Sequence, residues 1–338
     1  MTDGHVTLAL AGDTMLGRRV AAALRETPRA PLFSPRLVEL LREADLLVLN
    51  LECCVSDRGE PWPDSRKPFF FRAPPVAADE LAALGVRCVT LANNHALDFG
   101  PLALLDTVEH LERVGIAAVG AGADAVAARR AAVLEAKGLR VAVVGVTDHP
   151  AAYAATADRP GVAFADLRWQ VPPWVGDAVA AAAADAHAVV VLPHWGPNMN
   201  PRPLPFVKVA AGALRRAGAT VVAGTSAHVF QGVEDAVLYD LGDFVDDYRT
   251  DPVLRNDLGL LFFVTLDAAG GPVRIEAVPI ALDFCHTRLA SPDEARWIER
   301  RFRAACRELG TAVRGERGRL VVEAEDAAGR PDGVRTAR

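Results

Sequence analysis

The sequence is poor in cysteine, and its few cysteines do not form a recognisable site. Five are present among 338 residues: Cys53, Cys54, Cys88, Cys285 and Cys306. Their number is odd, and none of their spacings matches a zinc-binding pattern. We therefore interpret them as reduced thiols, which are typical of a reducing compartment.

The sequence also lacks a hydrophobic run long enough to span a bilayer. Its most apolar stretch, AVAAAAADAHAVVVL, is interrupted by an aspartate and a histidine. The first apolar run, within MTDGHVTLALAGD, is short and follows no cationic segment, so it predicts a first strand rather than a signal peptide. These absences predict a cytoplasmic protein without an integral membrane segment.

Positive charge is not in excess. Lysine and arginine number 37 against 43 acidic residues, a net charge of −6, which disfavours a nucleic-acid or anionic-membrane partner held by bulk charge. An anionic small-molecule or polymer substrate is compatible, because a metal ion or a local basic pocket can reverse the field. A doubly wound nucleotide-binding protein is disfavoured, because GDTMLG lacks the glycine spacing of a phosphate-binding loop.

Apolar runs alternate with helical stretches, and 51% of the residues are hydrophobic, which predicts an α/β protein with a sizeable core. Strands are predicted at Val6–Ala11, Leu46–Leu51, Cys88–Ala92, Ala117–Gly120, Val133–Glu135, Arg140–Val146, Ala188–Leu192, Thr220–Ala223, Val237–Leu241, Gly259–Leu266 and Val273–Ile280. Helices are predicted at Leu16–Leu24, Pro35–Glu43, Pro75–Leu84, Pro101–Val114, Asp177–Ala184, Pro205–Arg216 and Pro292–Glu308.

The chain shows no clean linker, so we expect a single domain over residues 1–328. Its core is expected at about 5–283, with a C-terminal helix and strand appendage at 291–325 and a disordered tail at 329–338. The proline-containing segment 148–176 is predicted to be a long irregular connection, either a lid or a simple crossover.

Polar residues of metal-ligand type follow successive predicted strands. They are Asp13, Asn50, Glu52, Asn94, His95, Asp98, His194, His228, Asp240 and Asp243. The ends of neighbouring parallel strands fall along one edge of a sheet, so these side chains are expected to converge there. Carboxylates, amides and imidazoles together suit Mn²⁺, Fe²⁺ or Zn²⁺ better than Ca²⁺ or Mg²⁺.

Each of these motifs also has a simpler explanation. Gly-Asp is common in turns, a lone histidine after a strand is more often a core or surface residue, and 224–228 reads equally well as a turn. The NNHxxD pattern is more specific, because Asp98 could orient the imidazole of His95. The joint recurrence of such residues after several strands favours a metal site.

Seven motifs in this order resemble the CapA family of poly-γ-glutamate capsule biosynthesis proteins, within the calcineurin-like metallophosphoesterase superfamily. The resemblance covers roughly Val6 to Val245. The motifs are GDTMLGR (12–18), NLE (50–52), FRAPP (71–75), LANNHALDFG (91–100), HWG (194–196), SAHVFQGVE (226–234) and YDLGDF (239–244).

The resemblance implies a four-layer α/β/β/α sandwich of the metallo-dependent phosphatase type, with mixed sheets. It also implies one or two divalent ions (Mn, Fe or Zn) at the strand ends. By the same resemblance, Asp13 and His228 would bind the first ion, Asn94 and His194 the second, and Glu52 would bridge the two. A bridging carboxylate holds two ions at about 3.5–4 Å, a spacing used for in-line displacement at phosphorus.

The resemblance further places His95 beside the phosphate, as a general acid or charge stabiliser held by Asp98. Relatives carry a further histidine where this chain has Thr225 or Ser226, and YDLGDF adds Asp240 and Asp243. These departures predict one tightly bound ion and one labile ion. Residues expected to contact substrate or support the ligands are Arg18, Asn50, Lys67, Arg72, Thr225, Ser226 and Asp243.

Two functions follow from the resemblance. The first is a metal-dependent hydrolase of phosphoester bonds linked to poly-γ-glutamate capsule synthesis. The second is a non-hydrolytic assembly factor that binds metal or an anionic polymer within a polymer-synthesis complex. The predicted absence of a membrane anchor weakens the capsule role, and the missing histidine favours the second function. Fold alone does not decide between them.

Overall fold

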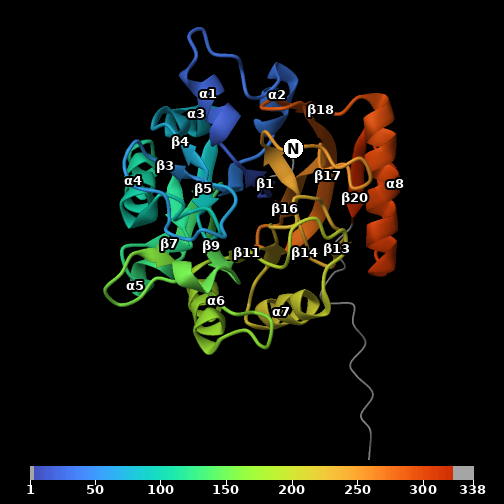
Figure 1. Cartoon of the computed structure of the whole chain (residues 1–338). Coiled ribbons are helices and arrows are strands. Elements are labelled where there is room, and N and C mark those ends of the chain that lie inside the picture. Colours follow the sequence, from blue (N-terminus) through green and yellow to red (C-terminus); the bar gives the residue numbers. More distant parts are fainter. Residues whose placement is uncertain (1–3, 323–338) are drawn as a thin grey trace, which may run out of the picture.

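The computed structural model describes residues 4–322, and two β-sheets form its centre (Figure 1). The larger sheet has, in spatial order, β19 (Arg314–Glu316), β20 (Arg319–Val322), β17 (Pro272–Leu282), β16 (Leu258–Leu266), β1 (Val6–Thr14), β2 (Leu46–Leu51), β5 (Val86–Thr90) and β6 (Ala117–Val119). In addition, β15 (Asp243–Val245) pairs with β1, and β18 (Thr287–Leu289) pairs with β17. Strands β1, β2, β5 and β6 are parallel, whereas β16 and β17 are antiparallel, so the sheet is mixed.

The smaller sheet is parallel at its centre. Its order is β13 (Val233–Glu234), β14 (Val237–Leu238), β12 (Val221–Ala223), β11 (Ala188–His194), β9 (Leu139–Thr147) and β8 (Ala132–Ala136). Two short pairs lie outside both sheets: β3 (Cys54–Val55) with β4 (Arg72–Ala73), and β7 (Ala121–Gly122) with β10 (Gly161–Val162).

Helices lie against the outer faces of both sheets, and the helix at 292–308 packs against the core between the sheets. The helices are α1 (Arg18–Arg25), α2 (Pro35–Leu41), α3 (Val76–Leu84), α4 (Gly100–Arg113), α5 (Ala125–Ala128), α6 (Pro173–Asp185), α7 (Pro205–Arg216) and α8 (Pro292–Glu308). Prolines in the first turn begin α2, α7 and α8, as the sequence predicts, because the missing N–H costs nothing there. None of the described helices combines the length and the apolar character that crossing a membrane requires.

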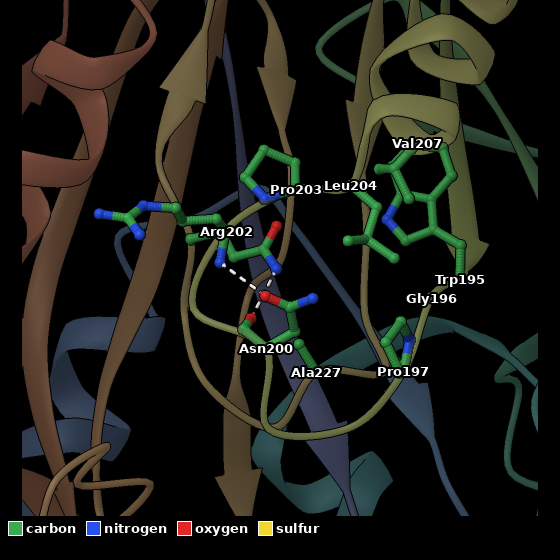
Figure 2. Close-up of a pocket in the computed structure, with 10 residues that line it drawn as sticks. Trp195, Gly196, Pro197, Asn200, Arg202, Pro203, Leu204, Val207 and Ala227 are labelled. Carbon is green, nitrogen blue, oxygen red and sulfur yellow. Dashed lines mark hydrogen bonds between the residues drawn. The ribbon is translucent and has the colours of Figure 1, made fainter.

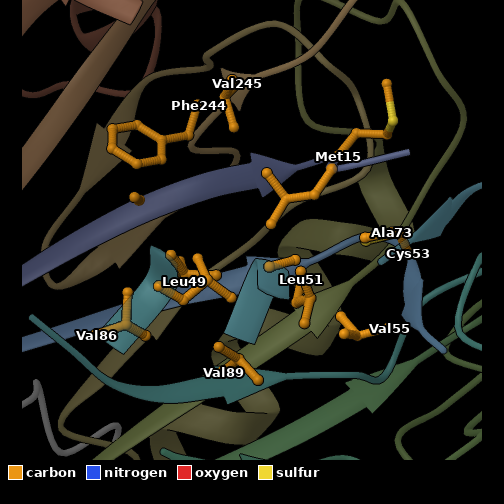
Figure 3. Close-up of a cluster of buried hydrophobic side chains, with 14 of the residues drawn as sticks. Met15, Leu49, Leu51, Cys53, Val55, Ala73, Val86, Val89, Phe244 and Val245 are labelled. Atoms are coloured by element: carbon orange, nitrogen blue, oxygen red, sulfur yellow. The ribbon is translucent and has the colours of Figure 1, made fainter. Parts of the chain in front are cut away.

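Three apolar layers separate the four layers of secondary structure. Alternate side chains of a strand face opposite sides, so Val141 and Val143 of β9 enter the core between the sheets, whereas Ala142 and Val144 pack under α6 and α7. The outer core of the larger sheet packs against α1 to α4; Figure 3 shows the part of it near the ends of β1, β2 and β5. This arrangement confirms the predicted four-layer α/β/β/α sandwich with mixed sheets.

Two regions differ from the sequence-based description. The segment 148–176 is less irregular than predicted: it contains a 3₁₀ turn at Ala151–Tyr153 and strand β10, and α6 begins within it at Pro173. Tyr153 is buried, so this part of the segment is anchored to the body of the protein. The predicted C-terminal appendage packs against the core through α8 and β20; the predicted tail at 329–338 lies outside the described residues.

Candidate metal centre

Asp13 lies where β1 meets two parallel neighbours. Bulges shift the register so that its Cα pairs with that of Asn50 in β2 and with that of Asp243 in β15. Asn50 Nδ2 donates to Asp13 Oδ1 at 2.6 Å, and both residues are buried. The pairing of β1 with β15 therefore brings the carboxylates of Asp13 and Asp243, which belong to two motifs distant in sequence, close together.

Glu52 follows β2 and is the most unusual group of the site. Its side chain is 0% exposed, and neither carboxylate oxygen has a hydrogen-bond partner among the described residues. Its Oε1 lies 3.9 Å from His194 Nε2, and its Oε2 lies 3.9 Å from His228 Nδ1. Burial raises the pKa of Glu52 well above its usual value. Buried carboxylates are normally paired or bound to metal, so this geometry fits a bridging metal ligand.

On one side of Glu52 lie Asp13, His228 and Asp243, here called the first cluster. His228 Nδ1 is 3.2 Å from Asp13 Oδ2 and 2.8 Å from Asp243 Oδ1. Burial alone would lower the pKa of His228, but the charges of Asp243 and Glu52 raise it well above its usual value. The three ligand atoms lie within 4.8 Å of one another, close enough to share one ion.

On the other side lie His194, at the end of β11, and Asn94, here called the second cluster. His194 Nε2 is 3.0 Å from Asn94 Oδ1, and its Nδ1 is 2.9 Å from Thr225 Oγ1. Burial lowers the pKa of His194 well below its usual value. The imidazole is therefore neutral, the form that binds metal. Asp13 Oδ1 is 3.9 Å from His194 Nδ1, so the two clusters adjoin.

His95 and Asp98 form a dyad beside the clusters. His95 Nδ1 lies 2.7 Å from Asp98 Oδ2, its ring stacks on Phe71 with centroids 4.0 Å apart, and its Nε2 lies 4.0 Å from Glu52 Oε1. Asp98 also accepts hydrogen bonds from the backbone N of Phe71, Lys67 Nζ and Tyr153 Oη. Burial lowers the pKa of His95 to about 4, so without substrate this imidazole is neutral near pH 7.

The structure separates the predicted supporting residues into those that adjoin the clusters and those that do not. Asn50, Thr225 and Asp243 contact predicted ligands, and Lys67 reaches the dyad and the carbonyl of Asn94. Ser226 donates its backbone N–H to Asp13, but its hydroxyl donates away from the clusters to Gly196 O. Arg18 is ion-paired with Asp247, and Arg72 stacks on Phe99.

Two residues at the site escaped the sequence analysis. The ring of Tyr248 lies 5.2 Å from that of His228, and its buried hydroxyl has no hydrogen-bond partner within residues 4–322. The ring of His149, a histidine for which the sequence predicts by default only a surface or structural role, lies 5.3 Å from that of His194. Tyr248 and His149 each follow the end of a strand, as the predicted ligands do. This position after a strand could have identified them from the sequence.

A small pocket lies next to the clusters. It is lined by Trp195, Gly196, Pro197, Asn200, Arg202, Pro203, Leu204, Val207, Ala227 and Gln231 (Figure 2). Trp195 and Ala227 neighbour His194 and His228 in the sequence, but no residue of either cluster lines the pocket. The pocket therefore flanks the candidate metal centre and is distinct from it.

Comparison with known proteins agrees with the motifs. The chain matches the family described as bacterial capsule synthesis protein PGA_cap over residues 7–248. The chain belongs to this capsule synthesis family. A "probable polyglutamine synthesis accessory protein" of Mycobacterium tuberculosis is 32% identical over an alignment of 357 residues, covering 91% of this chain and 93% of that protein. The PGA biosynthesis protein CapA of Bacillus subtilis is 27% identical, covering 73% of this chain and 64% of that protein.

Solved structures give a weaker likeness than these family members do. The NAD nucleotidase of Haemophilus influenzae superposes with a TM-score of 0.43 and 11% identity, covering 86% of this chain and 54% of that chain. A score of this size carries no argument about activity. The assignment to the capsule synthesis family rests on the sequence match. The buried cluster of aspartate, glutamate and histidine fits a metal ion.

Proposed function

We propose that this protein is a metal-dependent phosphoester hydrolase that serves poly-γ-glutamate or capsule synthesis. The observation that carries the proposal is Glu52, a fully buried carboxylate whose two unpartnered oxygens face different histidines. A carboxylate in this position is suited to bridge two divalent ions. Asp13 and His228 would hold the first ion, and Asn94 and His194 would hold the second.

Divalent ions, when bound, stabilise charge on a phosphoryl oxygen and lower the pKa of water enough for it to attack near neutral pH. The protein's own residues orient this chemistry. Asn50 and Thr225 fix Asp13 and His194 by hydrogen bonds. Asp98 fixes the His95 ring so that Nε2 faces Glu52. An anionic phosphoryl group beside Nε2 would raise the pKa of His95 and thereby favour the protonated form that donates to a leaving oxygen.

The substrate is expected to be an anionic small molecule or polymer, and a polymer-synthesis complex is the natural setting for a member of this family. A second function is a non-hydrolytic assembly factor that binds metal or an anionic polymer. Two observations favour it. The ligand amide of Asn94 is neutral, and the hydroxyls of Thr225 and Ser226 face His194 and Gly196 instead of replacing the missing histidine.

Purification without chelators, followed by metal analysis and a screen of phosphomonoesters and phosphodiesters with Mn²⁺, Fe²⁺ or Zn²⁺, separates the two functions. The hydrolase requires turnover that disappears in Asp13→Asn and persists in Asp177→Asn, a control at an exposed aspartate of α6. Bound metal without turnover on any ester would support the assembly factor. A protein that binds no divalent ion would refute the hydrolase and leave only an assembly factor that binds an anionic polymer.

A further inference from the structure

Two Gly-Asp dipeptides, distant in sequence, lie side by side in parallel strands. Gly12-Asp13 is in β1, Gly242 directly precedes β15, and Asp243 is the first residue of β15, in register with Asp13. Asp13 N donates to Gly242 O at 2.9 Å, and a Cβ on Gly12 would lie 1.8 Å from the same oxygen. Only glycine permits this approach. The pairing places both aspartate side chains on the same face of the sheet.

The imidazole of His228 occupies the space between these two carboxylates. Its Nδ1 lies 3.2 Å from Asp13 Oδ2, 2.8 Å from Asp243 Oδ1 and 3.9 Å from Glu52 Oε2. With bonds of about 2.1 Å, ligand atoms around an octahedral or tetrahedral ion are separated by roughly 3.0–3.4 Å. The distances from His228 Nδ1 to Asp13 and to Asp243 are close to this ligand-to-ligand separation. The distance to Glu52 Oε2 exceeds it by only about half an ångström.

Glu52 is an independent sign that a cation belongs here. It is 0% exposed, its oxygens are unpartnered among the described residues, and its Oε2 faces the first cluster. Three aspartate or glutamate side chains and one imidazole would then surround a single position. Protonated His228 can neutralise only part of that charge, whereas a divalent ion can bind all four groups.

We propose that Asp243 is a direct ligand of the divalent ion at the first cluster. The proposal rests on the metal-dependent function proposed above and deepens it. The first ion is held by Asp13, His228, Asp243 and one oxygen of Glu52, so three carboxylates contribute. The second ion has Asn94, His194 and the other oxygen of Glu52, and Asp13 also lies within reach of His194. Both of these carboxylates are shared with the first ion, so the second ion has no carboxylate of its own and binds more weakly.

The neighbouring acids of the same segment do not fit this role. Both oxygens of Asp240 accept backbone N–H groups, from Ala227 and Gly242, each at 2.9 Å. Asp246 accepts a hydrogen bond from the backbone N of Tyr248, and its Oδ2 has no hydrogen-bond partner among the described residues. Unlike Asp243, which pairs with His228 at 2.8 Å, Asp246 makes no ion pair with a described histidine. Of the two acids that distinguish YDLGDF, the structure therefore assigns ligation to Asp243.

The test compares Asp243→Asn with Asp246→Asn in the full chain. Each variant is titrated with Mn²⁺, and binding is measured by calorimetry and by electron paramagnetic resonance. Both variants remove one buried negative charge from the same segment. Loss of an outer-shell partner costs about 10–100-fold in metal affinity, so we expect Asp243→Asn to weaken the first ion by more than about 100-fold and Asp246→Asn to stay within or below the outer-shell range of about 10–100-fold. Equal losses in the two variants would overturn ligation and leave only a field effect.

A second variant gives a direct readout of ligation that does not depend on affinity or turnover. Asp243→Cys loaded with Co²⁺ should acquire a thiolate-to-cobalt charge-transfer absorption that the wild-type protein and Asp246→Cys lack. Absence of this absorption in a folded, Co²⁺-loaded Asp243→Cys protein would also overturn the proposal. If the wild-type protein itself binds neither Mn²⁺ nor Co²⁺, the proposed metal-dependent function fails, which is a distinguishable result.

Discussion

Asp13, His228 and Asp243 lie on one side of Glu52, and His194 and Asn94 lie on the other. The first cluster is built largely by the pairing of β1 with β15, and it offers two carboxylates besides Glu52. The second joins the end of β11 in one sheet to the loop after β5 in the other, and it offers a neutral amide. Each cluster has one histidine beside an oxygen of Glu52, but the two clusters differ in charge. Their different charge makes binding affinity the property that should distinguish them.

Removing the group common to both clusters should have the largest effect. Glu52→Gln keeps the shape of the side chain but removes the bridging charge. We expect turnover to fall by about 10³-fold or more and the bound metal to fall below one ion per chain, because both clusters lose a ligand. Metal analysis and initial rates measure this.

The same variant should stabilise the ion-free protein. A buried carboxylate without partners costs more stability than a neutral amide in the same place, and Glu52→Gln replaces the first with the second. Thermal unfolding in chelator should therefore give a higher Tm for the variant than for the wild type. A lower Tm together with unchanged metal content would show that Glu52 has a structural partner instead of a metal.

His95 tests whether the second side of the site performs chemistry beyond holding an ion. Its Nε2 is 4.0 Å from Glu52, and Asp98 already engages its Nδ1. His95→Asn should lower turnover by about 10²–10³-fold, in the range of general acid catalysis, while leaving the binding of both ions nearly unchanged. Rates measured with substrates of different leaving-group pKa check the role, because the deficit should be smallest for the best leaving group.

The sequence alone predicts many of the residues in the two clusters, but not all of them. Strand-end motifs predict Asp13, Glu52, Asn94 and His194 because each follows an apolar run directly. The convergence of the two sheets then brings them together. Some element bounds are likewise predictable, since strand β2 and helices α7 and α8 have the predicted bounds. The four layers follow from the family resemblance and not from these bounds.

Other features depend on contacts that no local pattern specifies. The register of β15 against β1 decides that Asp243 faces the first cluster and Asp240 does not. Arg18 is close to a motif in sequence, yet its guanidinium is bound to Asp247, 229 residues away. Tyr248 gains its place only because the chain folds back over His228. Such long-range pairings set which of several similar side chains reaches the site.

The pH dependence of metal binding should distinguish the clusters. Burial raises the pKa values of Glu52 and Asp243, and the charges of Asp243 and Glu52 raise that of His228. A raised pKa means that the ion-free protein gains stability below the ordinary pKa and loses it as pH rises through the shifted value. His228 of the first cluster therefore holds a proton near neutral pH that an ion must displace.

We accordingly expect the affinity of the first ion to rise by about tenfold per pH unit for each proton displaced. The ion-induced increase in Tm should widen over the same range. The second ion should depend less on pH, because burial keeps His194 neutral. Calorimetry in buffers of different ionisation enthalpy counts the protons released. Equal proton release from both ions would contradict the assignment.

The smallest expected effect is also the one that would erase the difference between the clusters. Asn94→Asp adds a carboxylate where the second cluster has a neutral oxygen 3.0 Å from His194 Nε2. The new carboxylate would attract the second ion, because two opposite unit charges about 3 Å apart interact by several kcal/mol even at a dielectric constant of about 20. Burial of the new charge offsets much of this gain. We expect a net increase of about tenfold in the affinity for the second ion and little change in the first.

Asn94→Gln, which lengthens the side chain without adding charge, is the control and should weaken the second ion. If Asn94→Asp leaves the second affinity unchanged, charge is not what separates the two clusters, and the position of His194 must limit binding instead.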